Sequence, residues 1–283
     1  MKIKKAIITA ASRTQRHIPL QTVIDREGHP RSVLSLLLDE IAGSGIKETA
    51  LVVSPGDEDL YRDAAPGHQD HLRFYVQEEA RGYGHAVHCA RAFTGDDPFL
   101  LMVSDHLYVS DDPKASCAAQ LIAAAEQQAS SMSAVQATHE SKLPHFGTIA
   151  GRLFKNFDHQ YEITRVAEKP TPTLAEQELV VPGMRQAHYL CFFGMHVLGP
   201  EIMHILDEQL ASLADGQNLS LSPALNELAS RSQYLALEVQ GRRYDLEERY
   251  GLLYGHLAVA LQSPYRDEVL SGLVELLARN GSR

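Results

Sequence analysis

The stretch VQEEARGYGHAVHCARAFTGDDPFLLMVSDHLY, residues 76–108, decides the predicted fold. Its apolar run FLLMV, residues 99–103, is typical of a strand buried on both faces, and the polar residues Ser-Asp-His follow it directly. The preceding segment, residues 84–93, has the composition of a helix and follows a loop that contains Gly82 and Gly84. A helix that leads into a buried strand predicts one unit of an α/β fold.

Strand and helix signals alternate on both sides of this unit. Residues 33–42 have helical spacing, whereas residues 171–185 show no period and are predicted to form a long loop. Further strands are predicted at residues 5–10, 49–54, 72–76, 133–138, 146–150, 161–167, 189–198 and 235–239. The alternation predicts a single α/β domain over residues 1–283, with a mixed, mostly parallel sheet flanked by helices.

Composition excludes several classes of protein. The chain has 283 residues, 44% of them hydrophobic, but its apolar runs are far shorter than the roughly 20 residues of a membrane helix. Its net charge of −10 argues against a general nucleic-acid binder, which carries a basic stripe. The cysteines Cys89, Cys117 and Cys191 lie too far apart in sequence to suggest a metal-ligand pair, and they favour a reducing cytoplasm.

The predicted sheet indicates where a ligand would bind. In an open parallel sheet, ligands lie at the carboxyl ends of the strands. Three segments follow predicted strands and therefore qualify, namely residues 11–25, 77–85 and 104–106.

Four ionisable residues follow strands and could carry chemistry, although each also has an ordinary structural explanation. Asp105 is either a turn residue or a Mg²⁺ ligand, and Asp245 offers a second carboxylate or a helix cap. Glu168 and Lys169 form either a solvated surface pair or a group that meets sugar hydroxyls and a phosphate. Taken singly, none of these positions decides between the two explanations.

Together and in this order, the motifs resemble those of the sugar-phosphate nucleotidyltransferases, and within that family the uridylyltransferases that use UTP and glucose 1-phosphate. The resemblance covers nearly the whole chain. Besides residues 76–108 it includes SLLLDEIAGSGIKETALVVSPGDEDLY, FGTIAG, VAEKPTP, YLCFFGMHVLGPEI and YDLEERYGLLYGHLAVAL. It implies a Rossmann-like fold with a nucleotide-binding half, residues 1–140, and a sugar-binding half, residues 141–283.

The resemblance also implies a reaction and its participants. An oxygen of the sugar 1-phosphate attacks the α-phosphorus of UTP, or of another nucleoside triphosphate such as dTTP, and pyrophosphate leaves. The implied cofactor is Mg²⁺, a homo-oligomer is common in the family, and neither nucleic acid nor a membrane is implied as a partner.

The implied site residues fall into four groups. Ala10, Ala11, Ser12, Gln77 and Gly82 match nucleotide-binding positions; Gly147, Glu168 and Lys169 match sugar- or phosphate-binding positions; Asp105 and Asp245 match the metal ligands; and Arg16, Asp105 and Lys169 match catalytic positions.

The loop after the first strand departs from the family pattern G-x-G-T-R. Here it reads Ser12-Arg13-Thr14-Gln15-Arg16, so both glycines are replaced, and about five further positions, including a lysine, are absent. A Cβ at a glycine position hinders close approach of a phosphate, whereas Arg13, Arg16 and Arg26 could supply positive charge. Three hypotheses therefore stay open: an active nucleotidyltransferase, a catalytically impaired binder of sugar nucleotides or sugar phosphates, and a structural subunit.

Overall fold

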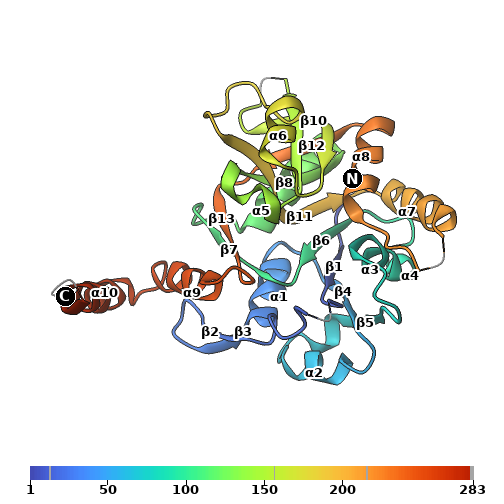
Figure 1. Cartoon of the computed structure of the whole chain (residues 1–283). Coiled ribbons are helices and arrows are strands. Elements are labelled where there is room, and N and C mark those ends of the chain that lie inside the picture. The colour runs from blue at the N-terminus through green and yellow to red at the C-terminus, as the bar shows by residue number, and fades with distance from the viewer. Residues whose placement is uncertain (13, 156, 215, 281–283) are drawn as a thin grey trace.

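A nine-stranded mixed sheet forms the centre of the molecule in the computed structural model, which describes residues 1–12, 14–155, 157–214 and 216–280 (Figure 1). The strand order is β5-β4-β1-β6-β11-β8-β12-β10-β9. In chain order the strands are β1 (Lys5–Thr9), β4 (Glu48–Val53), β5 (Leu72–Val76), β6 (Phe99–Val103), β8 (Ser131–His139), β9 (Thr148–Leu153), β10 (Gln160–Ala167), β11 (His188–Leu198) and β12 (Tyr234–Glu238).

The predicted mixed sheet is confirmed, but it is less parallel than the sequence indicates. Parallel pairing joins β5, β4, β1 and β6, and it recurs between β8 and β12. The strand β11 runs antiparallel to both of its main neighbours, β6 and β8, and β10 runs antiparallel to β12 and β9. Apolar periodicity reports which faces of a strand are buried and carries no information on its direction, so the number of antiparallel pairs in the predicted mixed sheet could not be read from the sequence.

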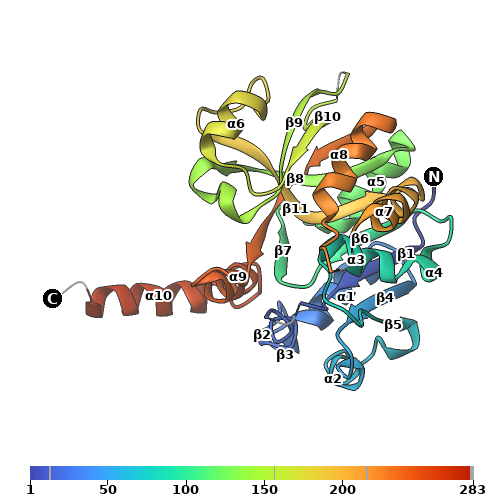
Figure 2. The same cartoon turned by 45° about the vertical axis from the view of Figure 1, so that its right-hand side comes forward.

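Helices cover both faces of the sheet, which explains the continuous apolar strands. The helices α1 (Val33–Gly43) and α5 (Cys117–Gln128) pack with Leu100 and Met102 of β6 in one core. The helices α3 (Tyr83–Cys89), α7 (Glu201–Ser212) and α8 (Leu221–Arg231) pack with Phe99 and Leu101 in the core on the opposite face (Figure 2). Since successive side chains of a strand point to opposite faces, residues 99–102 alternate between the two helix layers, and Val103 at the strand end lines a cavity instead.

Two helical segments differ from the prediction. The predicted helix 84–93 is interrupted at Ala90, where α3 ends and the short α4 (Arg91–Thr94) begins. The predicted loop 171–185 contains α6 (Pro172–Glu178), with Pro172 in its first turn and the Thr171 hydroxyl accepting a hydrogen bond from Leu174 N. This Thr-Pro start is a recognised helix signal, but the acidic, aperiodic sequence after it obscured the helix.

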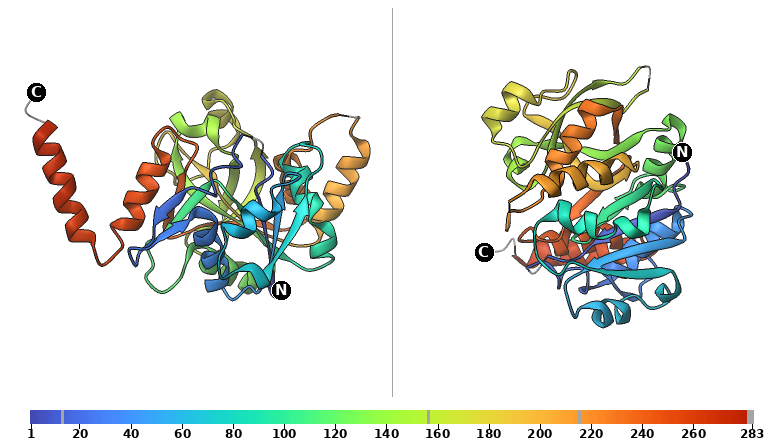
Figure 3. Two further views of the ribbon diagram at one scale, coloured as in Figure 1. Left: turned by 90° about the horizontal axis from the view of Figure 1, so that it is seen from below. Right: turned by 90° about the vertical axis from the view of Figure 1, so that its right-hand side faces the viewer.

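The remaining elements lie around the sheet. Two small antiparallel ladders pair β7 (His106–Ser110) with β13 (Gly241–Asp245) and β2 (Thr22–Ile24) with β3 (Pro30–Ser32). The others are α2 (Glu58–Asp63), two 3-10 turns (Gln69–His71 and Glu140–His145), α9 (Gly251–Ala260) and α10 (Arg266–Asn280). The last helix extends away from the body (Figure 3). Within the described ranges, no helix is both long and apolar enough to cross a membrane.

A buried histidine lies in the middle of the sheet and predicts acid sensitivity. His196 on β11 is 3% exposed, and its Nδ1 atom is hydrogen-bonded to the Ser133 hydroxyl of β8. Burial lowers the pKa of His196 to about 3. The unfolded chain would therefore take up a proton on this residue below its ordinary pKa of about 6.5, while the folded chain would not do so until about pH 3.

We expect this histidine to reduce the free energy of unfolding by about 2 kcal/mol between pH 7 and pH 5, at about 1.4 kcal/mol per pH unit below 6.5. Urea unfolding of the wild type and of His196→Gln at both pH values measures the effect, because glutamine cannot titrate. The same change at exposed His204 serves as the control. If the wild type and His196→Gln lose equal stability on acidification, the assignment is wrong.

Candidate active site

A cavity of about 470 Å³ opens where the carboxyl ends of β1, β5 and β6 meet the end of β10. Residues distant in sequence meet here because the parallel strands β1, β5 and β6 end at the same edge of the sheet, and the segment after the antiparallel strand β10 joins them. Of the residues predicted from the sequence, the cavity is lined by Ala10, Ala11, Ser12, Gln77, Gly82, Asp105, Glu168 and Lys169.

The loop after β1 borders the cavity without filling it, and hydrogen bonds from Ser54 and Tyr61 hold its backbone in place. The Ser54 hydroxyl donates a hydrogen bond of 3.1 Å to the Ala11 carbonyl. The buried Tyr61 hydroxyl lies 3.2 Å from the Ala10 carbonyl and 2.7 Å from the Arg16 carbonyl. These contacts fix the path of the loop between β1 and the turn that follows it.

The same loop forms a turn that consumes some of its backbone donors. The N–H groups of Gln15 and Arg16 both donate to the Ser12 carbonyl, at 3.3 and 2.9 Å. Donors used in this way cannot also bind a phosphate unless the turn opens. Ser12 and Thr14 line the cavity, with their hydroxyl oxygens 3.3 Å apart, so they offer side-chain donors instead.

The predicted catalytic role of Arg16 is not supported by its position. Its Nη1 atom lies 3.5 Å from Oδ1 of Asp57, its side chain is 57% exposed, and it is absent from the described lining of the cavity. Asp57 precedes α2 and draws the guanidinium outward. Arg13 lies outside the described residues, and Arg26 lines a different cavity.

Gln77 and Gly82 shape the side of the cavity below α3. The Gln77 side-chain amide donates a 3.1 Å hydrogen bond to the Gly82 carbonyl and lies 3.0 Å from Nδ1 of His85. Gly82 has a φ of 95°, and a Cβ at this position would lie only 2.7 Å from the Leu219 carbonyl oxygen. Only glycine fits there without strain, so a side chain at position 82 would displace the loop from Leu219.

Asp105 occupies the floor of the cavity directly after β6. Its side chain is 17% exposed, and Oδ1 lies 2.6 Å from Nδ1 of His106. Burial alone would raise the pKa of Asp105, but the charge and hydrogen bond of His106, together with the charge of Lys169, bring it below its ordinary value. The carboxylate is therefore ionised at neutral pH and suits a cation or a phosphate-bound metal.

Glu168 and Lys169 enter the cavity from the end of β10. The Ser222 hydroxyl at the start of α8 donates a hydrogen bond to Oε2 of Glu168 and fixes that carboxylate. Lys169 has a φ of 44°, a left-handed conformation that is costly for a lysine. Such a conformation at the end of a strand is a feature that clusters at functional sites.

Gly147 does not line the cavity among the described residues, but it lies behind Glu168. A Cβ at this position would lie 3.2 Å from Oε2 of Glu168 and 2.8 Å from the Phe192 ring. Its carbonyl accepts a 2.8 Å hydrogen bond from Phe192 N. The glycine thus permits the close approach of this loop to Glu168.

Asp245 lies near Asp105 across the β13–β7 ladder but lines a separate cavity. It pairs with His106 in the β13–β7 ladder, and the Asp105 carbonyl accepts a 2.9 Å hydrogen bond from Leu246 N. The Asp245 side chain accepts from Glu247 N at 2.9 Å and belongs to the cavity beside Lys142 and Arg243. In this conformation the two carboxylates do not share one cavity, so a joint metal site stays a prediction.

The residues fit a magnesium ion in part. Asp105 is an ionised oxygen ligand beside a cavity, and Mg²⁺ is commonly held by one or two carboxylates plus substrate phosphates. No group of three or more histidine, cysteine, aspartate or glutamate side chains gathers as a complete metal site in the part of the chain that is described. The chain therefore fits a metal that is completed by substrate phosphates better than a closed protein site.

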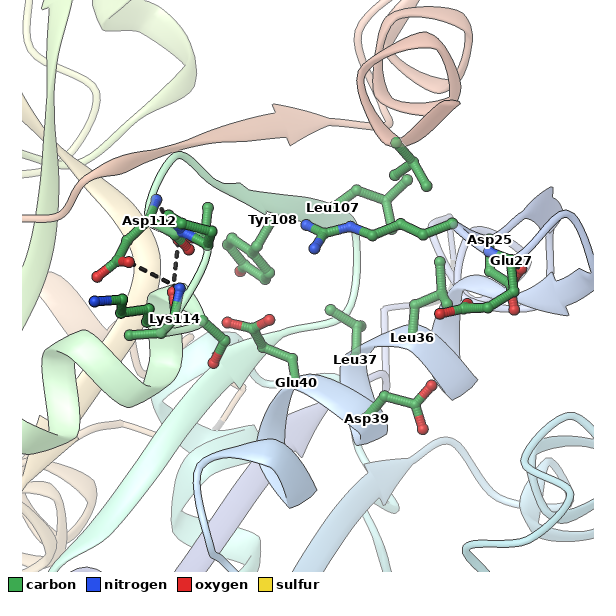
Figure 4. Close-up of a pocket in the computed structure, with 16 residues that line it drawn as sticks. Asp25, Glu27, Leu36, Leu37, Asp39, Glu40, Leu107, Tyr108, Asp112 and Lys114 are labelled. Atoms are coloured by element: carbon green, nitrogen blue, oxygen red, sulfur yellow. Dashed lines mark hydrogen bonds between the residues drawn. The ribbon is translucent and has the colours of Figure 1, made fainter. Parts of the chain in front are cut away.

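A further cavity of about 330 Å³ lies between α1 and β7 (Figure 4). Glu40 and Tyr108 point into it, and Asp112 and Lys114 lie at its far end. Oε1 of Glu40 accepts a 2.8 Å hydrogen bond from Ala118 N at the start of α5, and burial raises the pKa of Glu40 despite this bond. Glu40 thus acts as a structural tie between α1 and α5.

Sequence reasoning missed His106 and Ser222. His106 follows Asp105 directly in the Ser-Asp-His triplet, so its role as a partner of the carboxylate was available as a signal. Ser222 belongs to α8, a helix that the sequence did not predict, and nothing local connects it to Glu168, 54 positions earlier.

The comparisons with known proteins agree with this geometry. The family model described as nucleotidyl transferase matches residues 18–244. The chain is 28% identical over 305 residues to UTP–glucose-1-phosphate uridylyltransferase 2 of Staphylococcus saprophyticus, with 99% of each chain covered. It is 27% identical to the enzyme named UTP–glucose-1-phosphate uridylyltransferase of Staphylococcus epidermidis, with 98% of this chain and 99% of that protein covered.

Solved structures show the same fold. A UDP-glucose pyrophosphorylase from Acinetobacter baumannii matches with a TM-score of 0.74 and 21% identity, over 97% of this chain and 99% of that chain. A UDP-glucose pyrophosphorylase in complex with UDP-glucose matches with a TM-score of 0.70 and 22% identity, over 91% and 97%. Since the family model spans most of the 283 residues, the chain belongs to the nucleotidyl transferase family.

Proposed function

We propose that the chain transfers a uridylyl group from UTP to glucose 1-phosphate and forms UDP-glucose and pyrophosphate. The observation that carries the proposal is the cavity in which Gln77, Asp105, Glu168 and Lys169 converge from three loops, those after β5, β6 and β10. The proposal is also supported by the Staphylococcus relatives, which are named UTP–glucose-1-phosphate uridylyltransferase and align with nearly all of the chain.

In the proposed reaction a phosphate oxygen of glucose 1-phosphate attacks the α-phosphorus of UTP. A new P–O bond forms, the bond between the α-phosphorus and the oxygen that bridges to the β-phosphorus breaks, and pyrophosphate carries away that electron pair. Such transfers at phosphorus depend on positioning and on neutralising the charge of the phosphates.

Each residue of the cavity has a proposed part in that positioning. Lys169 holds the phosphate of the sugar phosphate, and Glu168, fixed by Ser222, accepts hydrogen bonds from the sugar hydroxyls. Gln77 and Gly82 face the base of the nucleotide, and the loop of Ala10, Ala11 and Ser12 borders its phosphates. Gly147 leaves room for the sugar beside Glu168.

Magnesium completes the proposed site. Asp105, with Asp245 as a second proposed ligand, would hold Mg²⁺, which neutralises charge on the phosphates when it is bound. The same proposal includes three finer assignments. Residues 1–140 form the nucleotide-binding half and residues 141–283 the sugar-binding half, and the chain forms a homo-oligomer. It is located in the cytoplasm, which is consistent with the free thiols of the described cysteines.

Pyrophosphate release tests the proposal. The purified chain with Mg²⁺ is given UTP or dTTP together with glucose 1-phosphate, galactose 1-phosphate or mannose 1-phosphate. The proposal expects release that requires both substrates and is fastest with UTP and glucose 1-phosphate. A preference for dTTP or for another sugar phosphate would correct the substrate and keep the reaction class.

The turn at Ser12 and the outward position of Arg16 favour a second candidate, a binder that has lost its chemistry. That candidate expects no pyrophosphate release with any pair, while UDP-glucose still raises the melting temperature of the chain. Absence of both release and binding would contradict both candidates.

A further inference from the structure

A buried arginine lies outside the residues that the proposed reaction uses. Arg243 is in the middle of β13, directly opposite Tyr108 of β7, and is 8% exposed. It lines a cavity of about 370 Å³ that is distinct from the candidate active site and is bounded by β8, β13 and the start of α9. A volume of this size accommodates a small metabolite.

The Arg243 guanidinium has few partners for a buried charge. Nη2 donates a 3.3 Å hydrogen bond to the Thr138 hydroxyl, and the guanidinium carbon lies 3.9 Å from the centroid of the Phe146 ring. The buried Nε and Nη1 atoms have no hydrogen-bond partner among the described residues. No carboxylate of that same set lies within 4.0 Å of the guanidinium.

Leaving a buried charge in this state is costly. An ionised group removed from water without a counter-charge loses several kcal/mol unless other interactions compensate for it. A stacked aromatic ring and one neutral hydroxyl return only part of that cost. Arginine also remains protonated in proteins, so it cannot escape the cost by losing its proton.

The two acidic residues of the cavity, Glu248 and Asp245, act on the charge of Arg243 from a distance, but each also has a partner of its own. Lys142 Nζ contacts both carboxylate oxygens of Glu248, at 2.5 and 2.6 Å. Oδ1 of Asp245 accepts from Glu247 N. The cavity also contains Arg242 and His139, and its buried side-chain atoms without a partner among the described residues, Nε and Nη1 of Arg243, both donate hydrogen bonds. The unpaired N–H groups of Arg243 therefore suit an anion and not a cation.

We propose that this cavity binds a small metabolite through an oxyanion, a phosphate or a carboxylate group, that pairs with the Arg243 guanidinium. The planar guanidinium matches the geometry of both groups and forms charge-assisted hydrogen bonds with them. The proposal is argued from the Arg243 guanidinium and does not require the uridylyl transfer proposed above, although Asp245, the second proposed Mg²⁺ ligand, also lines this cavity.

The cavity contacts the candidate active site through aromatic side chains. The Phe146 ring that stacks on Arg243 also lies edge-on to His106, with ring centroids 6.3 Å apart. His106 in turn holds the Asp105 carboxylate. The contacts from Arg243 to Phe146, from Phe146 to His106 and from His106 to Asp105 therefore connect the proposed anion site to the carboxylate proposed to hold Mg²⁺.

Thermal unfolding of the full chain tests the anion site. The melting temperature is followed in HEPES buffer, with ionic strength held constant by NaCl, as inorganic phosphate or malonate is added in separate titrations. We expect a saturable rise with at least one of the two anions. A rise with phosphate alone assigns a phosphorylated ligand, and a rise with malonate alone assigns a carboxylated one.

Variants separate this site from the nucleotide cavity. Lys169→Met removes the charge proposed to bind phosphate in that cavity and is expected to keep the response. Arg243→Met is expected to lose it, and Arg243→Lys, which keeps the charge and so protects the fold, to need ~10- to 100-fold more anion. Arg249→Gln, an exposed arginine in the next turn of chain, is the matched control and is expected to respond as the wild type does.

Two results would overturn the proposal. One is a wild-type melting temperature that neither anion changes at constant ionic strength. The other is a rise that is the same in the wild type and in Arg243→Lys or Arg243→Met, because the anion would then bind elsewhere.

Discussion

Replacing Asp105 with asparagine is expected to lower the rate of pyrophosphate release by about 100- to 1,000-fold, the effect typical of removing one charge-stabilising group from a polar active site. Asparagine has nearly the same shape as aspartate and keeps one oxygen that can accept the hydrogen bond from His106. It removes the negative charge that suits the carboxylate for Mg²⁺. The loss is expected in kcat and to persist at saturating UTP and glucose 1-phosphate.

The measurement is a steady-state assay of pyrophosphate over a range of Mg²⁺ concentrations, with melting temperature as the check of folding. Because Asp105 has a lowered pKa, the wild type is expected to need no further deprotonation of this group between pH 6 and 8. Asp96→Asn, at an exposed aspartate after α4, is the matched control and is expected to be fully active. An Asp105→Asn enzyme that keeps more than a tenth of wild-type activity would remove Asp105 from the proposed mechanism.

The sequence predicts the framework of this site because strand ends are readable. Runs such as FLLMV mark strands that are covered on both faces, and the residues after them must meet at one edge of the sheet. Gln77 and Asp105 were placed at one edge of the sheet by that rule, whereas Lys169 was assigned to the site by the family resemblance, and the structure brings all three together. Backbone burial and strand order thus carry most of the information about where the site lies.

The directions of side chains are not readable in the same way. Arg16 follows the expected strand, yet the nearby carboxylate of Asp57 draws it outward, and the sequence does not pair residues 41 positions apart. The backbone of Asp245 lies beside that of Asp105 across the β13–β7 ladder, but its side chain accepts a local hydrogen bond from Glu247 N. Such choices depend on competing partners at single positions, which a pattern of apolar residues does not encode.

The second large effect is expected at Lys169. Replacing it with methionine keeps most of the unbranched side chain and removes its charge, and we expect kcat/KM for glucose 1-phosphate to fall by about 100-fold. Hydrogen bonds between charged groups contribute about 1.5–3 kcal/mol, and the charge is proposed to act on a phosphate in the transition state as well as in the ground state. The KM for glucose 1-phosphate is therefore expected to rise while the response to UTP is preserved.

Lys155 provides an unusually close control for this substitution. Like Lys169 it has a positive φ, 52° against 44°, so both methionine variants place the same residue in a left-handed backbone conformation. Lys155 is exposed, lies over the Phe154 ring at 4.5 Å from its centroid, and is not among the described residues that line the cavity. Any loss of activity in Lys169→Met beyond that in Lys155→Met then reflects the charge at the site and not the backbone.

The outcome at Lys169 also bears on the altered loop. The lysine that the family carries in the opening loop is absent here, and Arg16 turns outward toward Asp57. Among the described residues that line the cavity, Lys169 is the cation whose charge acts on Asp105. If the chain is an active transferase, Lys169 must supply a large share of the positive charge that the phosphates require. Lys169→Arg, which keeps this charge, is therefore expected to retain more activity than Lys169→Met. Activity that is indifferent to Lys169→Met would show that the charge comes from elsewhere, and would reject the proposed role of this residue.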